Sequence, residues 1–238
     1  MNQSNFKKCW YESVCLECDG SPCSSLNSCI RYLEMSYLMK ESGLPQSKQR
    51  PIILDAYKED YDAYVVLDDI RMVIGSFVQE GNNILISSSN TGNGKTSWAI
   101  KLLLKYFDEV WAGNGFRVRG LFVHVPTLLM SLKNFENPLS ETYKQNLLNA
   151  DLVVWDDIAV MGASAYDYSN LLMYIDHRIL NEKSNIFTSN IVEAEDFVQN
   201  IGMKLTSRIL NSSKQIVFTG KDRRNGSITN NQQSIRNR

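Results

Sequence analysis

The residues with the clearest chemical meaning lie between Asn83 and Thr96, where an apolar stretch runs into a turn that ends in Gly-Lys-Thr. Backbone N–H groups of such a turn can face phosphate oxygens, Lys95 can reach the β- and γ-phosphates, and the Thr96 hydroxyl can face Mg²⁺. A helix expected over residues 96–107 would point its positive end at the anion. The predicted phosphate-binding loop consists of Ser89, Asn90, Thr91, Gly92, Asn93, Gly94, Lys95 and Thr96.

Ser89 occupies the first glycine position of the usual loop spacing, G-x-x-x-x-G-K-[ST]. Serine fits a tight turn but adopts left-handed backbone angles less readily than glycine, so the sequence predicts a slightly altered loop. A Gly-Lys-Thr tripeptide alone also occurs by chance in surface turns. The nucleotide-binding interpretation therefore depends on acidic residues that could complete the site.

A pair of carboxylates ends the apolar segment Leu152-Val-Val-Trp-Asp-Asp157. We expect Asp156 to meet the magnesium shell beside Thr96 and Asp157 to polarise the attacking water. Two aspartates could instead simply cap the next segment. Asn190 ends a later apolar segment and would lie near the γ-phosphate if the two strands are neighbours, although asparagine after a strand is ordinarily a turn residue.

A similar apolar and acidic run, Val65-Val-Leu-Asp-Asp69, comes before the loop. Its apolar residues continue at three- and four-residue intervals through Val78, and Gly81 follows, so the pattern predicts an amphipathic helix. Asp68 and Asp69 are expected in the solvated first turn of that helix.

All five cysteines lie near the start of the chain: Cys9, Cys15, Cys18, Cys23 and Cys29. In a cytosolic chain, clustered thiols more often bind a metal than form disulfides. The two-residue spacing between Cys15 and Cys18 lets two thiolates share one tetrahedral Zn²⁺. Four of the five would suffice, with Cys23 and Cys29 as completing ligands and Cys9 in reserve. An iron–sulfur cluster and unliganded thiols are the alternatives.

To position these groups, the main domain shows strand and helix signals in alternation, which predicts an α/β fold with a parallel sheet and helices on its faces. The five expected strands are residues 83–88, 120–125, 151–156, 184–190 and 214–220. Ahead of them, the spacing of Ile30, Leu33, Tyr37 and Leu38 predicts a helix that stops at Gly43.

Three segments are expected along the chain. Residues 1–48 would form a small cysteine-rich domain, residues 49–224 the main domain, and residues 225–238 a disordered tail without apolar periodicity. The polar segment 46–50 marks the linker between the first two.

The formal net charge of −1 creates no chain-wide attraction to nucleic acid, so DNA binding would need a local patch. The candidate cations are Lys101, Lys105, Arg117, Arg119 and Lys133. His124 lies in an apolar strand and is expected to be buried, without metal-ligand neighbours. The chain has no run of 18 apolar residues and no signal-peptide pattern, so a cytoplasmic protein is expected, in a bacterium or in a host infected by phage.

Four segments together resemble the bacterial and phage helicase loaders of the DnaC/DnaI type, which are AAA+ ATPases. The segments are the loop ending at Thr96, the acidic segment ending at Asp157, Thr188-Ser-Asn190 and Leu205-Thr-Ser-Arg-Ile209. The resemblance covers about residues 52–223. It implies an AAA+ core, ATP and Mg²⁺ as cofactors, and a role in DNA replication as a loader that places a replicative ring helicase on single-stranded DNA.

The resemblance also implies roles for single residues. Asn190 corresponds to the sensor 1 residue, and Arg208 to an arginine finger offered to the ATP of a neighbouring subunit. Arg223 or Arg224 matches the arginine of the closing motif. ATP would then be hydrolysed at the boundaries of a homo-oligomer that assembles on ATP or DNA, and an isolated monomer would be a weak ATPase. The cysteine-rich region resembles the zinc-binding domain through which DnaI-like proteins contact the helicase.

Three other functions remain open from the sequence. An IstB-like transposition ATPase shares the core motifs and would differ in having a transposase partner. An ATP-binding adaptor with little hydrolysis is favoured by Ser89 and by Asp157 in place of glutamate. A small-molecule P-loop kinase is disfavoured, because it leaves Asn190 and Arg208 without a role.

Overall fold

The computed structural model of the protein describes residues 29–49, 52–54, 57–133, 139–159 and 165–223. Four of the five cysteines, the predicted tail and Arg224 lie outside these ranges. Within these ranges, no helix is long and apolar enough to cross a membrane.

Five parallel strands form one sheet in the order β2-β3-β4-β1-β5. The strands are β1 (Asn83–Ser87), β2 (Gly120–His124), β3 (Leu152–Asp156), β4 (Ser184–Ser189) and β5 (Ser213–Val217). All five lie where the sequence predicts them, and β5 ends three residues early. The central strands β1, β3 and β4 are buried along their whole length, since helices cover both faces of the sheet.

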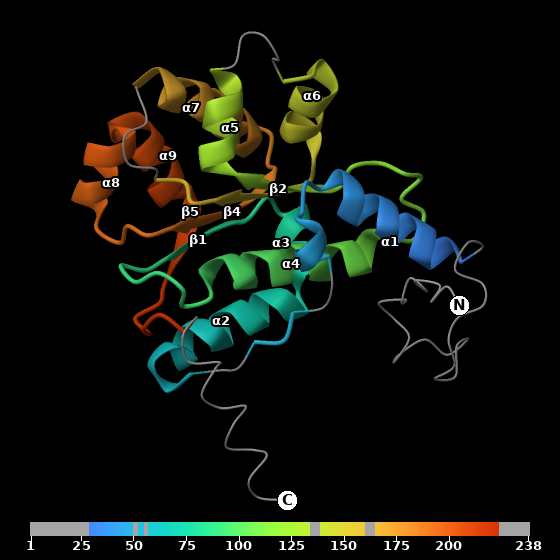
Figure 1. The fold of residues 1–238 in the computed structure, drawn as a ribbon, viewed down its shortest axis with the longest axis horizontal. Helices are drawn as coiled ribbons and strands as arrows, with labels where there is room; N and C mark the ends of the chain where they lie inside the picture. Colours follow the sequence, from blue (N-terminus) through green and yellow to red (C-terminus); the bar gives the residue numbers. More distant parts are fainter. Residues whose placement is uncertain (1–28, 50–51, 55–56, 134–138, 160–164, 224–238) are drawn as a thin grey trace, which may run out of the picture.

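The helices form two layers (Figure 1). One face of the sheet is covered by α1 (Ile30–Glu41), α2 (Tyr61–Met72), α3 (Ile74–Gln79) and α4 (Lys95–Val110). The other face is covered by α5 (Val125–Leu132), α6 (Glu141–Asn149), α7 (Ala165–Leu180), α8 (Ala194–Ile201) and α9 (Met203–Ser212). Alternate residues of β1 supply the two cores: Ile84 and Ile86 pack toward α4, and Leu85 packs toward the opposite layer.

The helix predicted around Asp68 and Asp69 exists, but its first turn lies elsewhere. Helix α2 begins at Tyr61, so both aspartates belong to later turns, and Asp62 is the acidic residue of the first turn. Asp68 accepts a hydrogen bond from Arg71 at 2.7 Å instead of facing the helix dipole. The apolar spacing that continues past these residues is divided at Val73, where α2 ends and α3 begins.

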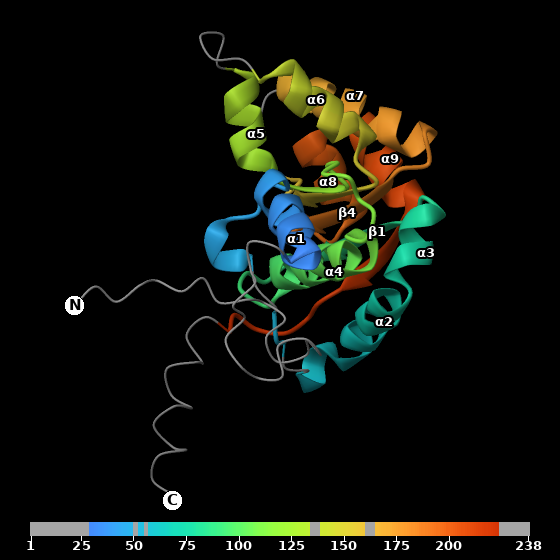
Figure 2. The same cartoon turned by 90° about the vertical axis from the view of Figure 1, so that its right-hand side faces the viewer.

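Helix α1 packs against α4 and shares its core, as the two views of Figures 1 and 2 show. Its buried face consists of Glu34, Met35, Leu38 and Met39. Of the apolar face predicted from the sequence, Leu38 is buried, whereas Ile30 and Leu33 are exposed. Glu34 is buried because its carboxylate accepts hydrogen bonds from the Asn114 side chain and the Phe116 amide, both at 3.4 Å.

The chain after α1 is tied to the edge of the sheet. The Phe122 amide of β2 donates to the Ser42 carbonyl at 2.7 Å, and Leu44 belongs to the same core as α4. Residues 30–44 therefore share the core of the following domain, although the sequence placed them in a unit ending at residue 48. The separate cysteine-rich unit and the tail stay predictions.

Candidate nucleotide-binding site

The predicted phosphate-binding loop connects β1 to the first turn of α4. Gly92 and Gly94 have positive φ angles of 69° and 105°, and Gly94 is the residue before the helix. Among the described residues, the non-glycine residues with positive φ are Phe116, Asp157 and Glu182, so Ser89 is not in the left-handed region. The predicted alteration of the loop by left-handed strain at Ser89 is therefore wrong, because this position does not need glycine's freedom.

Lys95 is buried and folds back over the loop from which it projects. Its ammonium group donates hydrogen bonds to the Asn90 carbonyl at 2.8 Å and to the Asn93 side-chain oxygen at 3.3 Å. The Asn93 amide in turn donates to the Ser88 hydroxyl at 2.6 Å. Phosphate oxygens that enter the loop would replace the Asn90 and Asn93 oxygens as acceptors of the Lys95 ammonium group. This arrangement suits a cation that binds the β- and γ-phosphates.

Two hydroxyls converge on the carboxylate of Asp156 at the end of β3. Thr96 donates to Asp156 Oδ1 at 2.7 Å, and Thr188 of the neighbouring strand β4 donates to the same oxygen at 2.8 Å. Burial raises the pKa of the Asp156 carboxyl, and the charge of Asp157 adds to this, while the two hydroxyl contacts lower it. A carboxylate beside a threonine hydroxyl is an oxygen donor set that fits Mg²⁺.

Asp157 and Asn190 meet directly after β3 and β4. The Asn190 side-chain amide donates to Asp157 Oδ1 at 3.3 Å, so the condition that the two strands be neighbours is fulfilled. Asp157 has a φ of 55°, and its backbone N–H donates to the Thr188 hydroxyl at 3.0 Å. A non-glycine residue held in the left-handed region costs about 1–3 kcal/mol and is typical of functional sites. Asp157 lines the same cavity as residues of the loop.

One cavity of about 480 Å³ brings most of the predicted site residues together, whereas Ser89, Asn90 and Asp156 are not part of its lining. Its lining consists of Lys48, Thr91, Gly92, Asn93, Gly94, Lys95, Thr96, Ser97, Asp157 and Asn190. The volume is within the usual range for small-molecule sites. Sequence reasoning missed two of these residues, Ser97, which directly follows the motif, and Lys48. Nothing in the polar segment 46–50 distinguishes Lys48 from a linker lysine.

His124 also lies at this edge of the sheet, contrary to the expectation that it is buried and lacks metal-ligand neighbours. It is the last residue of β2, opposite Asp156 in the register, and its side chain is 45 % exposed. Its Nδ1 lies 2.8 Å from the Thr127 hydroxyl, and its Nε2 lies 3.9 Å from Asp157 Oδ2. The donor atoms of His124, Asp156 and Asp157 all lie within 4.8 Å of one another. The middle of the apolar strand β2 is buried, but its last residue, His124, lies at the carboxyl end of the strand, where the side chain is exposed beside the site.

Arg208 does not line the cavity. It projects from α9 with its side chain 53 % exposed, and its Nε lies 2.5 Å from Asp176 Oδ1 of α7. Within one chain it has no part in the arrangement around Lys95. Its role as a finger toward a neighbouring subunit stays a prediction.

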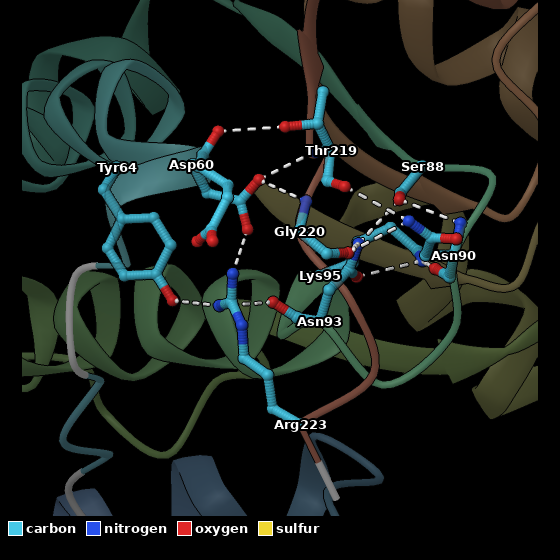
Figure 3. Close-up of polar contacts among 10 residues, drawn as sticks. Asp60, Tyr64, Ser88, Asn90, Asn93, Lys95, Thr219, Gly220 and Arg223 are labelled. Carbon is cyan, nitrogen blue, oxygen red and sulfur yellow. Dashed lines mark hydrogen bonds and ion pairs between the residues drawn. The ribbon is translucent and has the colours of Figure 1, made fainter. Parts of the chain in front are cut away.

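Arg223 contacts the loop from the side of β5 (Figure 3). Its backbone N–H donates to the Gly92 carbonyl at 3.1 Å, and its guanidinium donates to the Asn93 carbonyl at 3.0 Å and the Tyr64 hydroxyl at 3.1 Å. The same guanidinium forms an ion pair with Asp60. These contacts fix the backbone of the loop, and Arg223 is not part of the cavity lining.

Residues 219–223, here called the strap, connect the loop to the start of α2. Asp60 accepts hydrogen bonds from the backbone amides of Thr219 at 2.7 Å and Gly220 at 2.9 Å. On the other side, the Asn90 side chain donates to the carbonyls of the same two residues at 3.2 and 3.1 Å. Figure 3 shows this double attachment, which places the strap between Asp60 and the loop.

The cations proposed from sequence to bind DNA do not form one patch. Arg119, directly before β2, lies 2.5 Å from Asp151. Lys105 of α4 lies 3.0 Å from Glu109. Lys133 follows α5 in the opposite layer and lies 2.8 Å from Asp167. Each of these three cations is paired with a carboxylate, and Lys133 lies in the other layer from Lys105, so the three do not make one continuous surface for a phosphate backbone.

No family model matches the sequence, and no curated protein is a significant match. Solved structures do match the fold. A DnaC helicase loader has a TM-score of 0.60 at 20 % identity, covering 70 % of this chain and 94 % of its own. DnaI has a TM-score of 0.59 at 19 % identity, covering 76 % and 94 %. AMPPCP-bound DnaA from Aquifex aeolicus has a TM-score of 0.55 at 17 % identity, covering 71 % and 50 %. The chain therefore has a fold similar to that of the DnaC and DnaI helicase loaders.

Proposed function

We propose that the protein is an ATP-dependent loader that places a replicative ring helicase on single-stranded DNA, with ATP hydrolysed at subunit boundaries. The observation that carries the proposal is the single cavity in which Lys95, Asp157 and Asn190 meet, beside the Thr96–Asp156 pair. Structures with this fold include a helicase loader and a DnaA bound to AMPPCP and single-stranded DNA.

Each residue of the site has a chemical part in this proposal. Lys95 binds the β- and γ-phosphates, and Thr96 with Asp156 would hold Mg²⁺, which neutralises phosphate charge when bound. Asp157 accepts a proton from the attacking water, and Asn190 orients the Asp157 carboxylate through the 3.3 Å hydrogen bond. Arg208 of a neighbouring subunit would stabilise charge on the transferred phosphate, which predicts a slow monomer.

The partners follow from the same proposal. The cysteine-rich region would hold Zn²⁺ and contact the helicase, and the ATPase subunits would assemble on single-stranded DNA. An IstB-like transposition ATPase and an adaptor with little hydrolysis remain the competing functions. The position of Asp157 favours hydrolysis over the adaptor, because its carboxylate lines the cavity and accepts a hydrogen bond from Asn190 there.

Nucleotide binding is tested by Lys95→Ala, measured by calorimetry with ATP and Mg²⁺. The matched control is Lys105→Ala on the same helix, which removes one charge outside the cavity. We expect Lys95→Ala to abolish binding and the control to retain it. If both variants bind ATP like the unchanged protein, Lys95 belongs to a turn and the proposal fails.

Hydrolysis between subunits is tested by mixing two inactive variants in the presence of single-stranded DNA. Arg208→Ala chains keep a complete pocket, while Asp157→Asn chains keep the arginine. Phosphate release should recover partly at intermediate mixing ratios. No recovery at any ratio, together with a rate per chain that is independent of protein concentration, would place the whole catalytic site within one chain.

A further inference from the structure

Lys48 is a cation that enters the nucleotide cavity from a segment the motifs do not include. It ends a short 3-10 turn, Gln46–Lys48, in which its backbone N–H donates to the Pro45 carbonyl at 2.7 Å. The Gln49 side chain donates to the Leu44 carbonyl at 2.8 Å, and Leu44 is buried in the core. The segment that carries Lys48 is therefore held in its local turn and attached to the core at its start, through Leu44.

The route of this segment indicates which end of the cavity Lys48 reaches. Ser42 is bonded to Phe122 in β2, and β2 lies beside β3, which ends at Asp156. The strap, which follows β5, contacts the loop from the opposite edge of the sheet. Lys48 therefore comes from the side of β2 and β3 and shares the cavity lining with Asp157 and Asn190, the residues expected at the γ-phosphate.

Lys48 combines a place in the cavity lining with the lack of a carboxylate partner among the described residues. Other exposed lysines, such as Lys58 and Lys204, also have no ion pair there, but they do not line the cavity. Lys105, Lys133 and Lys144 each pair with a carboxylate within 3.0 Å. Lys48 is exposed and has no ion pair with any of the residues whose positions the structure gives. A cation that faces a phosphate-binding cavity without a carboxylate partner keeps its donors for a bound anion.

We propose that Lys48 binds the γ-phosphate of the nucleotide held in its own subunit, which rests on the proposed ATP-binding function. A contact with the γ-phosphate exists for a triphosphate and is lost with a diphosphate, so Lys48 sets the preference of the pocket for ATP over ADP. Because Lys48 follows α1 by a short anchored segment, ATP also holds that segment against the pocket. By linkage, a partner that binds more weakly or more tightly when ATP holds this segment changes the affinity for ATP by the same factor as ATP changes the affinity for that partner.

The test uses Lys48→Met in the full chain, which keeps the length of the side chain and removes its charge. Affinities for the non-hydrolysable AMPPNP and for ADP are measured by calorimetry with Mg²⁺. We expect the AMPPNP affinity to fall about tenfold, the scale of one hydrogen bond to a charged group, and the ADP affinity to change less than about twofold. Lys48→Arg, which retains a cation, should restore most of the preference.

The control is Lys40→Met, which removes a charge from α1 at a position 83 % exposed and outside the cavity. It should leave both affinities unchanged. Equal losses for AMPPNP and ADP in Lys48→Met, or no loss for either, would overturn the proposal. Lys95→Ala separates this outcome from failure of the proposed function: if Lys95→Ala loses both nucleotides while Lys48→Met loses neither, ATP binds without Lys48.

Discussion

Asp60→Asn removes one charge from the attachment between the strap and α2 and leaves the shape of the side chain unchanged. The Asp60 side chain is fully buried, and one of its oxygens accepts from the amides of Thr219 and Gly220. The asparagine oxygen can still accept both amides. The NH₂ group of the asparagine then faces the guanidinium of Arg223. Both groups are hydrogen-bond donors, so the contact between them is unfavourable and the ion pair is lost.

The expected cost follows from the burial of the two partners. Removing one member of a buried ion pair costs about 3–5 kcal/mol, because the other charge stays without compensation. Arg223 is 17 % exposed, so water can hydrate part of its charge, and we expect about 2–3 kcal/mol of lost stability. Since Arg223 also donates to the Asn93 carbonyl of the loop, ATP affinity should fall about tenfold.

Urea unfolding gives the stability change, and calorimetry with ATP gives the affinity at a temperature where both proteins are fully folded. Asp62→Asn is the matched control, since Asp62 is exposed in the first turn of the same helix. If Asp60 acts through Arg223, then Asp60→Asn and Arg223→Met together should cost less than the sum of the two single changes. Stability within about 0.5 kcal/mol of the unchanged protein, or strict additivity, would refute the reasoning.

Three further outcomes are expected. Arg178 is fully buried, burial lowers its pKa to about 9, and it donates hydrogen bonds to three carbonyls within 2.9 Å. Arg178→Leu leaves these carbonyls without their donor, so the free energy of unfolding measured in urea should fall by at least about 3 kcal/mol. Gly92→Ala should weaken ATP binding far more than Gly113→Ala, because both glycines have φ near 68° but Gly92 lines the cavity and Gly113 does not, and a Cβ at Gly92 would force the Asp222 side chain to move. Elemental analysis should find about one Zn²⁺ per chain. If the analysis finds no zinc and no iron, the predicted metal site is wrong.

The sheet could be predicted from sequence because its strands are short, continuous apolar runs. Such runs are required where both faces of a strand are covered, as in β1 and β3. The carboxyl ends of parallel strands meet at one edge, so the relation between Lys95, Asp156 and Asn190 followed from the order of the motifs. The buried face of α1 could not be predicted from apolar spacing in the same way. Glu34 is buried because its carboxylate accepts two hydrogen bonds from residues of a distant loop, whereas the apolar Ile30 is exposed.

Lys48, His124 and Asp60 could not be recognised in the sequence for a common physical reason. Each acts across the fold: Asp60 bonds to Gly220, 160 positions away, and Lys48 reaches a cavity whose other lining residues begin at Thr91. Local spacing carries no information on such contacts, since any surface lysine or helix-capping aspartate has the same neighbours in sequence. Their roles depend on the strand order, which brings the β2 and β5 edges to opposite ends of the cavity.

The strap also explains why the loop accepts Ser89 in place of glycine. Glycine is needed where the backbone must adopt left-handed angles, and here those angles occur at Gly92 and Gly94. The remaining loop positions are held by side chains: Asn90 bonds to the strap, and Asn93 bonds to Ser88. A loop whose conformation is fixed from outside by residues 219–223 no longer depends on a glycine at its first position. The departure from the motif therefore has its compensation about 130 residues further along the chain, where β5 ends beside β1.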